Sequence, residues 1–236
     1  TAWLMGKNYT PNTIASQYSI IKVWLKEAEE SNLITDKAFH HYQTKCRDVE
    51  NIYLTEDELE RLYNIDFSSE EIREQIDPQS RIETTRDLFI VACWTGLRYS
   101  DWSNLSNADL TEENMRVRTH KTDKTVVIPL HPMVKSIIEK YQGRLPRSVD
   151  KSKTLRHIRK CAEIAGINNL VTLTKVKGGR SITSTRPKYE HIMNHTARRT
   201  FATLMYLKRV PSQSIMAITG HTTEDNFLKY IKVSKE

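Results

Sequence analysis

Apolar side chains near the start of the chain recur at the spacing of a helix. Between residues 10 and 31 the recurring positions are Ile14, Tyr18, Ile21, Trp24, Leu25 and Ala28. Wound at 3.6 residues per turn, they share one face, so the pattern predicts an amphipathic helix. A turn with a short element at 32–41 and a linker at 48–53 complete this first part of the chain.

A second group of elements begins at residue 55, where T-E-D-E has the pattern of a helix-capping box. Residues 66–80 are acidic and predict a loop. The run 88–94 is apolar almost all round, which is typical of a buried central helix, and Gly96 is placed to end that helix. Ser100 can then cap the next short helix, with Asp101 in its first turn.

Two segments alternate in the manner of β-hairpins. Residues 115–118 and 125–130 flank a turn that carries Lys121 at its tip, and residues 171–189 surround the pair Gly178-Gly179. Helices are predicted at 132–141 and 154–165, and a closing helical region follows from residue 194. The expected fold class is therefore mainly α with small β-hairpins, an α+β protein.

The charged side chains are distributed unevenly. Residues 53–150 hold 13 basic and 18 acidic side chains, whereas residues 151–236 hold 17 basic and only 5 acidic ones. A basic surface of this kind attracts a polyphosphate partner such as DNA. No apolar run is long enough to cross a membrane, and the three cysteines are far apart, so a reduced cytosolic compartment is expected.

The basic final third also contains the residues most suited to chemistry. His195 and Arg198 are three apart and share one face of a helix, for which Asn194 is a candidate N-cap. Gly220 permits a break in the chain, which lets His221 and Tyr230 aim inward from separate segments. Cations and imidazoles that face a phenol suit an anionic centre attacked by tyrosine.

Five motifs occur in a fixed order along the chain. They are T-G-L-R-Y-S-D at 95–101, K-T-D-K-T-V-V-I-P-L at 121–130, H-T-A-R at 195–198, G-H at 220–221 and Tyr230. This order and spacing resemble the tyrosine recombinase (phage integrase) family over residues 53–236. The resemblance implies a catalytic domain at 51–236. It also implies that residues 1–50 are the C-terminal part of a helical core-binding (SAM-like) domain with its linker.

The resemblance further implies a site-specific DNA recombinase, similar to the integrases of bacterial mobile elements. Such an enzyme cleaves and rejoins DNA through a 3′-phosphotyrosyl intermediate, without a cofactor or a metal ion. The implied partners are double-stranded DNA, three further copies of the chain in a tetramer on that DNA, and accessory DNA-bending or excision proteins. The implied location is the bacterial cytoplasm, at the nucleoid.

Each motif residue takes a role under this resemblance. Tyr230 is the nucleophile, and Arg98 and Arg198 clamp the non-bridging phosphoryl oxygens. His195 is the general base or proton shuttle, and His221 donates a hydrogen bond to the phosphate.

The remaining assignments concern the hairpins and their neighbours. Lys121 is the general acid for the leaving 5′-oxygen, with Lys124 as the competing choice, and Asp101 orients His195 or Arg98. The expected DNA contacts are Lys124, Lys175, Lys177, Arg180 and Arg199.

Plainer interpretations exist for the same residues. Arg98 is placed to form a structural salt bridge with Asp101, and a tyrosine near a chain end is more often a packing residue. His191 and His195 have a zinc-compatible spacing, but no further ligand accompanies them. Two rival functions are a type IB topoisomerase, which reseals the same strand, and a DNA-binding module without catalytic turnover.

Overall fold

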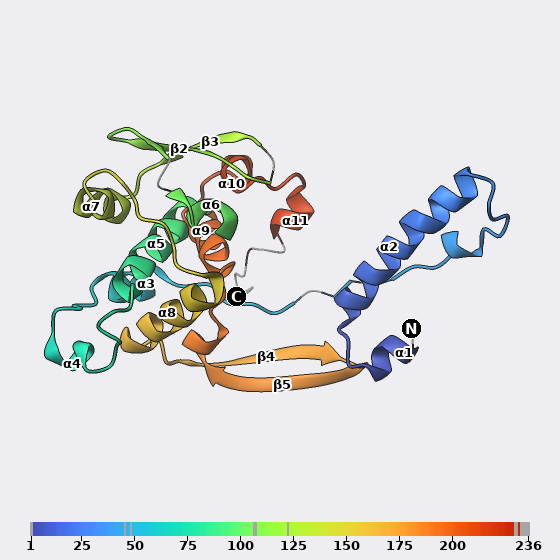
Figure 1. The fold of residues 1–236 in the computed structure, drawn as a ribbon, viewed down its shortest axis with the longest axis horizontal. Helices are drawn as coiled ribbons and strands as arrows, with labels where there is room; N and C mark the ends of the chain where they lie inside the picture. Colours follow the sequence, from blue (N-terminus) through green and yellow to red (C-terminus); the bar gives the residue numbers. More distant parts are fainter. Residues whose placement is uncertain are drawn as a thin grey trace. The chain divides into compact units, whose positions relative to one another are not determined.

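The structure is a computed structural model that describes residues 2–44, 46–47, 49–105, 108–121, 123–228 and 231. The α-helices are α1 (Ala2–Gly6), α2 (Pro11–Glu30), α3 (Glu56–Tyr63), α4 (Glu70–Arg73), α5 (Ile82–Thr95), α6 (Tyr99–Trp102), α7 (Pro132–Lys140), α8 (Lys151–Ile164), α9 (Thr196–Leu207), α10 (Ser212–Thr219) and α11 (Glu224–Leu228). The strands are β1 (Asp109–Leu110), β2 (Asn114–Arg118), β3 (Thr125–Pro129), β4 (Leu170–Lys177) and β5 (Arg180–Pro187). Two 3₁₀ turns, η1 (Ala38–His40) and η3 (Lys188–His191), complete the set (Figure 1). The predicted α+β fold class is confirmed.

The chain divides into two compact units. One comprises Thr1–Glu50 with Val171–Thr185, and the other comprises Asn51–Leu170 with Arg186–Glu236. The sequence pattern places the second hairpin in the C-terminal domain, whereas most of that hairpin packs with the N-terminal segment. No helix in the described part of the chain is both long and apolar enough to cross a membrane.

The first unit is built on α2, which confirms the predicted amphipathic helix. Its N-terminus is fixed by the Thr10 hydroxyl, which accepts the Thr13 backbone N–H, and Pro11 occupies the first turn. Of the predicted apolar face Ile14 is buried, whereas Ile21 and Trp24 are exposed.

The β4–β5 hairpin joins this unit through its tip and one edge. The backbone N–H of Gly178 donates to the carbonyl of Tyr9 at 3.1 Å, and the Thr174 backbone N–H donates to the Glu50 carboxylate at 2.6 Å. A side chain at Gly178 would meet Asn8 at 2.7 Å, so only glycine permits this close approach.

The second unit is organised around α5, which is buried along nearly its whole length, as its apolar run predicts. Helices α7, α8 and α9 pack against it (Figure 1). The capping box at Thr55 forms as predicted, with Thr55 and Glu58 each bonding the other's backbone N–H. The segment 66–80 is not entirely loop, because α4 forms within it. Helix α8 begins three residues earlier than predicted, since the Asp150 carboxylate caps it.

The predicted first hairpin is confirmed and carries an additional strand. Strands β2 and β3 pair antiparallel with Arg118 opposite Thr125, so Lys121 lies in the turn between them. The short strand β1 pairs with β2 and extends the sheet to three strands. It was not predicted, because a strand of two residues is too short to show an alternating pattern.

Gly96 ends α5 in the left-handed conformation, with φ 65°, and a side chain there would overlap the ring of Phe201. Gly143 has φ 79° but open space around its α-carbon. We expect Gly96→Ala to lower the free energy of unfolding by about 3 kcal/mol, from backbone strain plus overpacking.

The matched control Gly143→Ala should lower the free energy of unfolding by only about 1 kcal/mol, because it introduces backbone strain but no steric overlap. Urea denaturation of both variants measures the difference. Equal losses in the two variants would show that Phe201 moves aside freely.

Candidate active site

Two helices of the second unit end with the same dipeptide in the same geometry. Thr95 closes α5 and Thr219 closes α10, and each hydroxyl donates to the carbonyl four residues earlier, at 2.8 and 2.7 Å. The following glycines, Gly96 and Gly220, adopt left-handed φ values of 65° and 64°. Each turn halts its helix sharply and leaves the glycine carbonyl available to a partner outside the helix.

Each of these glycine carbonyls accepts a hydrogen bond from an arginine of another segment. Arg198, on α9, donates from Nη1 to the Gly96 carbonyl at 3.0 Å. Arg98, which follows Gly96, donates from Nη2 to the Gly220 carbonyl at 3.4 Å. Arg198 is only 3% exposed, whereas Arg98 is half-buried. Each guanidinium is therefore fixed by the end of a helix to which it does not belong, and the charges of both act on His221.

Arg98 itself is the N-cap residue of α6, in extended conformation, and no side chain caps that helix. The prediction that Ser100 caps it is wrong, since Ser100 lies inside the first turn. The chain turns so sharply at Gly96 that the helix begins before Ser100 is reached. This short connection to a buried helix holds Arg98 in a defined position.

His221 lies beside both arginines. Its Nδ1 is 2.8 Å from the Thr219 hydroxyl oxygen, and its ring meets the edge of Phe227 with centroids 5.8 Å apart. Burial, together with the positive charges of Arg198 and Arg98, lowers the pKa of His221 to about 4. The imidazole is therefore neutral at physiological pH in the DNA-free protein.

His195 occupies the N-cap position of α9, and its side chain is exposed and makes no capping bond. Asn194 is not the N-cap, contrary to the prediction. The Thr196 hydroxyl accepts the Met193 backbone N–H and sets the helix start one residue later than expected. Partial desolvation, followed by the charges of Arg199 and Arg198, lowers the pKa of His195, so it too favours the neutral, proton-accepting form.

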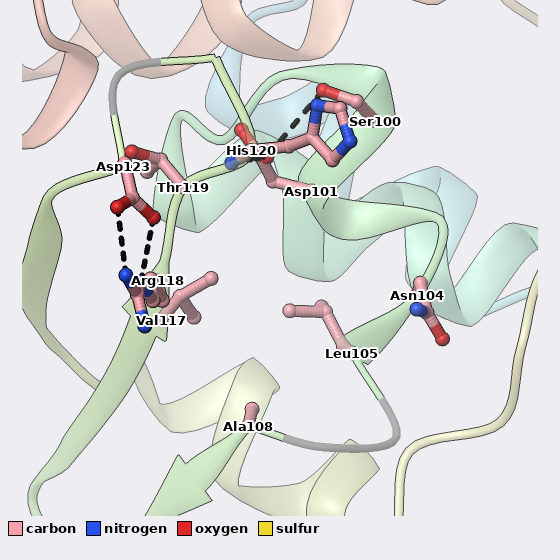
Figure 2. A pocket seen from close by; sticks show the side chains of 10 residues that line it. All are labelled: Ser100, Asp101, Asn104, Leu105, Ala108, Val117, Arg118, Thr119, His120 and Asp123. Atoms are coloured by element: carbon pink, nitrogen blue, oxygen red, sulfur yellow. Dashed lines mark hydrogen bonds and ion pairs between the residues drawn. The ribbon is translucent and has the colours of Figure 1, made fainter.

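The backbone N–H of Asp101 donates to the carbonyl of Arg98 at 2.9 Å, in the first turn of α6. Its Oδ1 accepts the backbone N–H of His120 at 2.9 Å, and its Oδ2 has no hydrogen-bond partner among the described residues. The carboxylate thus ties α6 to the β2–β3 turn. Its expected role in orienting His195 or Arg98 stays a prediction. It lies at the wall of a cleft of about 520 Å³ between these elements (Figure 2).

The two candidate lysines of the β2–β3 turn differ in their surroundings. Both are exposed. A second cleft, of about 320 Å³, is lined by Lys124 together with Gly220 and His221. Among the residues that the structure describes, Lys121 does not line this cleft.

Comparison with known proteins agrees with the motif order. Residues 52–236 match the model of the phage integrase family. The chain belongs to that family.

Individual relatives cover nearly the whole chain. The tyrosine recombinase XerC of Rickettsia typhi is 22% identical over 99% of this chain and 74% of its own length. A lambda integrase dimer bound to a COC′ core site aligns with TM-score 0.65 and 17% identity over 96% of this chain and 75% of that one. The Tn1549 transposon integrase in complex with circular intermediate DNA aligns with TM-score 0.64 and 16% identity, over 98% and 78%.

This phage integrase family member is a site-specific recombinase of the tyrosine class. Tyr230 lies outside the described residues. The segment that leads to it is anchored by Phe227 of α11, which is fully buried against Phe201, Ala202 and Ile215.

The predicted DNA contacts fall at three places in the recombinase, of which the first is the exposed Lys124 between β2 and β3. Arg199 lies on α9, near enough to His195 for its charge to act on that ring. Lys175, Lys177 and Arg180 are exposed on the β4–β5 hairpin.

Sequence reasoning missed three participants in the site: the carbonyls of Gly96 and Gly220, and the Thr219 hydroxyl. The sequence does contain a signal that could have identified them. The dipeptide Thr-Gly occurs twice, before Leu97-Arg98 and before His221. Within the described ranges no group of three His, Cys, Asp or Glu side chains is arranged to hold a metal ion. The chemistry available is charge stabilisation by two guanidiniums beside two neutral imidazoles.

Proposed function

We propose that this recombinase cleaves DNA by attack of Tyr230 on a backbone phosphate that is held by Arg98 and Arg198. The observation that carries the proposal is a pair of hydrogen bonds: Arg198 donates to the Gly96 carbonyl, and Arg98 donates to the Gly220 carbonyl. A phosphodiester attacked by a phenol gains negative charge on its two non-bridging oxygens. Two arginines fixed in advance are suited to stabilise that charge.

The histidines and a lysine complete the proposed site. Neutral His195 accepts the proton of the attacking phenol, and His221 lies beside the arginines where the phosphate would bind. Lys121 remains the proposed general acid, which protonates the leaving 5′-oxygen. The place of Lys124 in the cleft beside His221 supports the competing assignment, so the two lysines need to be separated by experiment.

The proposed substrate is double-stranded DNA, and the proposed active assembly is a tetramer. The lambda integrase structures support this, since they include a dimer bound to a core site and a tetramer bound to a Holliday junction. Residues 1–50 are proposed to belong to a core-binding domain and residues 51–236 to form the catalytic domain. The likeness to the Tn1549 transposon integrase supports a role in moving a mobile element. A location in the bacterial cytoplasm at the nucleoid and accessory DNA-bending or excision proteins belong to the same proposal.

The β4–β5 hairpin is proposed as a contact to the DNA backbone. Hydroxyl pairs Thr172–Thr185 and Thr174–Thr183, with oxygens 2.8 and 3.3 Å apart, lie on one face of the hairpin. Because successive side chains of a strand alternate, Lys175, Lys177 and Arg180 all fall on the other face. That segregation gives one polar, uncharged face and one basic face suited to phosphates.

We expect Arg98→Ala and Arg198→Ala each to slow cleavage of a nicked suicide duplex by about 10²–10³-fold, because each removes a donor to the developing charge. Tyr230→Phe should abolish the denaturant-resistant protein–DNA adduct. The control Arg144→Ala removes an exposed arginine after α7 and should cleave at the parental rate.

An adduct that persists in Tyr230→Phe would refute the assigned nucleophile. Strand exchange between two labelled duplexes distinguishes a recombinase from a topoisomerase, which reseals only the original strand. DNA binding without any adduct in the parent protein would instead indicate a binding module.

The general acid can be identified with a substrate that carries sulfur in place of the bridging 5′-oxygen. A thiolate leaves without protonation, so the variant that lacks the acid should be slow on the oxygen substrate and near the parental rate on the sulfur one. We expect this rescue in Lys121→Ala and not in Lys124→Ala. Rescue of Lys124→Ala alone would transfer the role to Lys124.

Replacing Lys175, Lys177 and Arg180 by alanine should weaken DNA binding at all sequences. It should also reduce the slope of log K against log salt by about 2–3, since each lost phosphate contact contributes about 0.9. The control triple variant Thr172→Ala, Thr174→Ala and Thr183→Ala alters the opposite face and should leave the slope unchanged. An unchanged slope in the basic-face variant would exclude phosphate contact by this hairpin.

A further inference from the structure

The Thr219 side chain lies between two partners. Its hydroxyl oxygen is 2.7 Å from the Ile215 carbonyl oxygen and 2.8 Å from Nδ1 of His221. The residue is fully buried, so water does not supply or remove these hydrogen bonds. The positions of the protons are therefore determined by the Thr219 hydroxyl, the Ile215 carbonyl and the His221 ring.

A threonine hydroxyl has one proton to donate, and a carbonyl oxygen can only accept. The contact with Ile215 therefore uses the proton of Thr219. The contact with His221 is then a hydrogen bond only if the imidazole donates it from Nδ1. We infer that Thr219 is a positioning residue that holds His221 as the Nδ1–H tautomer, which leaves Nε2 unprotonated and able to accept a hydrogen bond.

The charges around the ring keep this tautomer from gaining a second proton. Arg98 faces it from the α5–α6 connection, Arg198 from α9, and Lys124 lines the same cleft from the β2–β3 hairpin. From α11 the ring meets the apolar Phe227. The folded-state pKa near 4 lies below the ordinary value of 6.5, so the neutral ring predominates above about pH 4.

This state changes the role expected of His221 in the proposed reaction. An unprotonated Nε2 cannot donate a hydrogen bond to a non-bridging phosphoryl oxygen. The negative charge of a bound phosphate opposes the arginine charges and raises the pKa of the ring, which favours proton uptake from solvent at Nε2. DNA and one proton therefore bind together, and His221 becomes a donor only in the complex.

The tautomer can be measured directly in the DNA-free protein. Long-range ¹H–¹⁵N spectra of protein labelled at its 8 histidines report which ring nitrogen carries the proton, and His221→Gln identifies the signal. We expect a protonated Nδ1 and an unprotonated Nε2 at pH 7. A proton on Nε2 in the parent protein would overturn the inference.

Substitutions of Thr219 test its role in holding that tautomer. Thr219→Val should shift the His221 signals toward the Nε2–H form, and Thr219→Ser should restore the parental pattern. Thr95→Val is the matched control, because Thr95 makes the same bond at the end of α5 and is followed two residues later by Leu97 instead of a histidine. His221 signals that are unchanged in Thr219→Val would also overturn the inference.

The consequence for the reaction rests on the proposed function and has a separate readout. Calorimetry of DNA binding in two buffers of different ionisation enthalpy should show uptake of about one proton, lost in His221→Gln. Thr219→Val should slow cleavage by about 10–100-fold with an altered pH profile, and Thr219→Ser should recover most of the rate. Parental rate and profile in Thr219→Val would refute the positioning role.

The two sets of outcomes are distinguishable. If the parent forms no covalent adduct with DNA, the proposed function fails, while the ¹⁵N spectra still decide the tautomer. If the adduct forms but Nε2 carries the proton, the proposed function stands and the inference about Thr219 fails.

Discussion

The site depends on two hydrogen bonds between guanidinium groups and the carbonyls of glycines that end helices. A carbonyl at a helix C-terminus lacks its usual intrahelical donor and carries the negative end of the helix dipole, so it is a favourable partner for a cation. Here Gly96 receives Arg198 and Gly220 receives Arg98. Two like charges can lie beside the same histidine because each guanidinium is compensated by the carbonyl of a helix-ending glycine.

The same arrangement sets the behaviour of the histidines. A neutral imidazole is the more stable form wherever two fixed guanidiniums and partial burial oppose a further positive charge. His195 and His221 both experience this, although His221 is the more strongly affected. Both imidazoles are therefore neutral beside the fixed positive charges of the arginines.

Much of the fold could be predicted because its signals are local. The apolar run of α5, the capping box at Thr55 and the alternation around residues 119–124 each identify an element without reference to the rest of the chain. Two predicted helix starts were wrong. The short connection after Gly96 starts α6 before Ser100, and the Thr196 hydroxyl starts α9 one residue later than Asn194 would. Contacts between distant segments, such as Asp101 with His120 or Gly178 with Tyr9, carry no periodic pattern at all.

The ring of Phe201 has two neighbours that matter to the site. It fills the space beside Gly96, whose carbonyl holds Arg198, and it belongs to the apolar cluster that receives Phe227 from α11. One aromatic side chain therefore packs both against the turn whose carbonyl accepts a hydrogen bond from Arg198 and in the cluster that contains Phe227 of α11. A substitution of Phe201 would therefore disturb two places at once, the left-handed turn that ends α5 and the apolar cluster that buries Phe227.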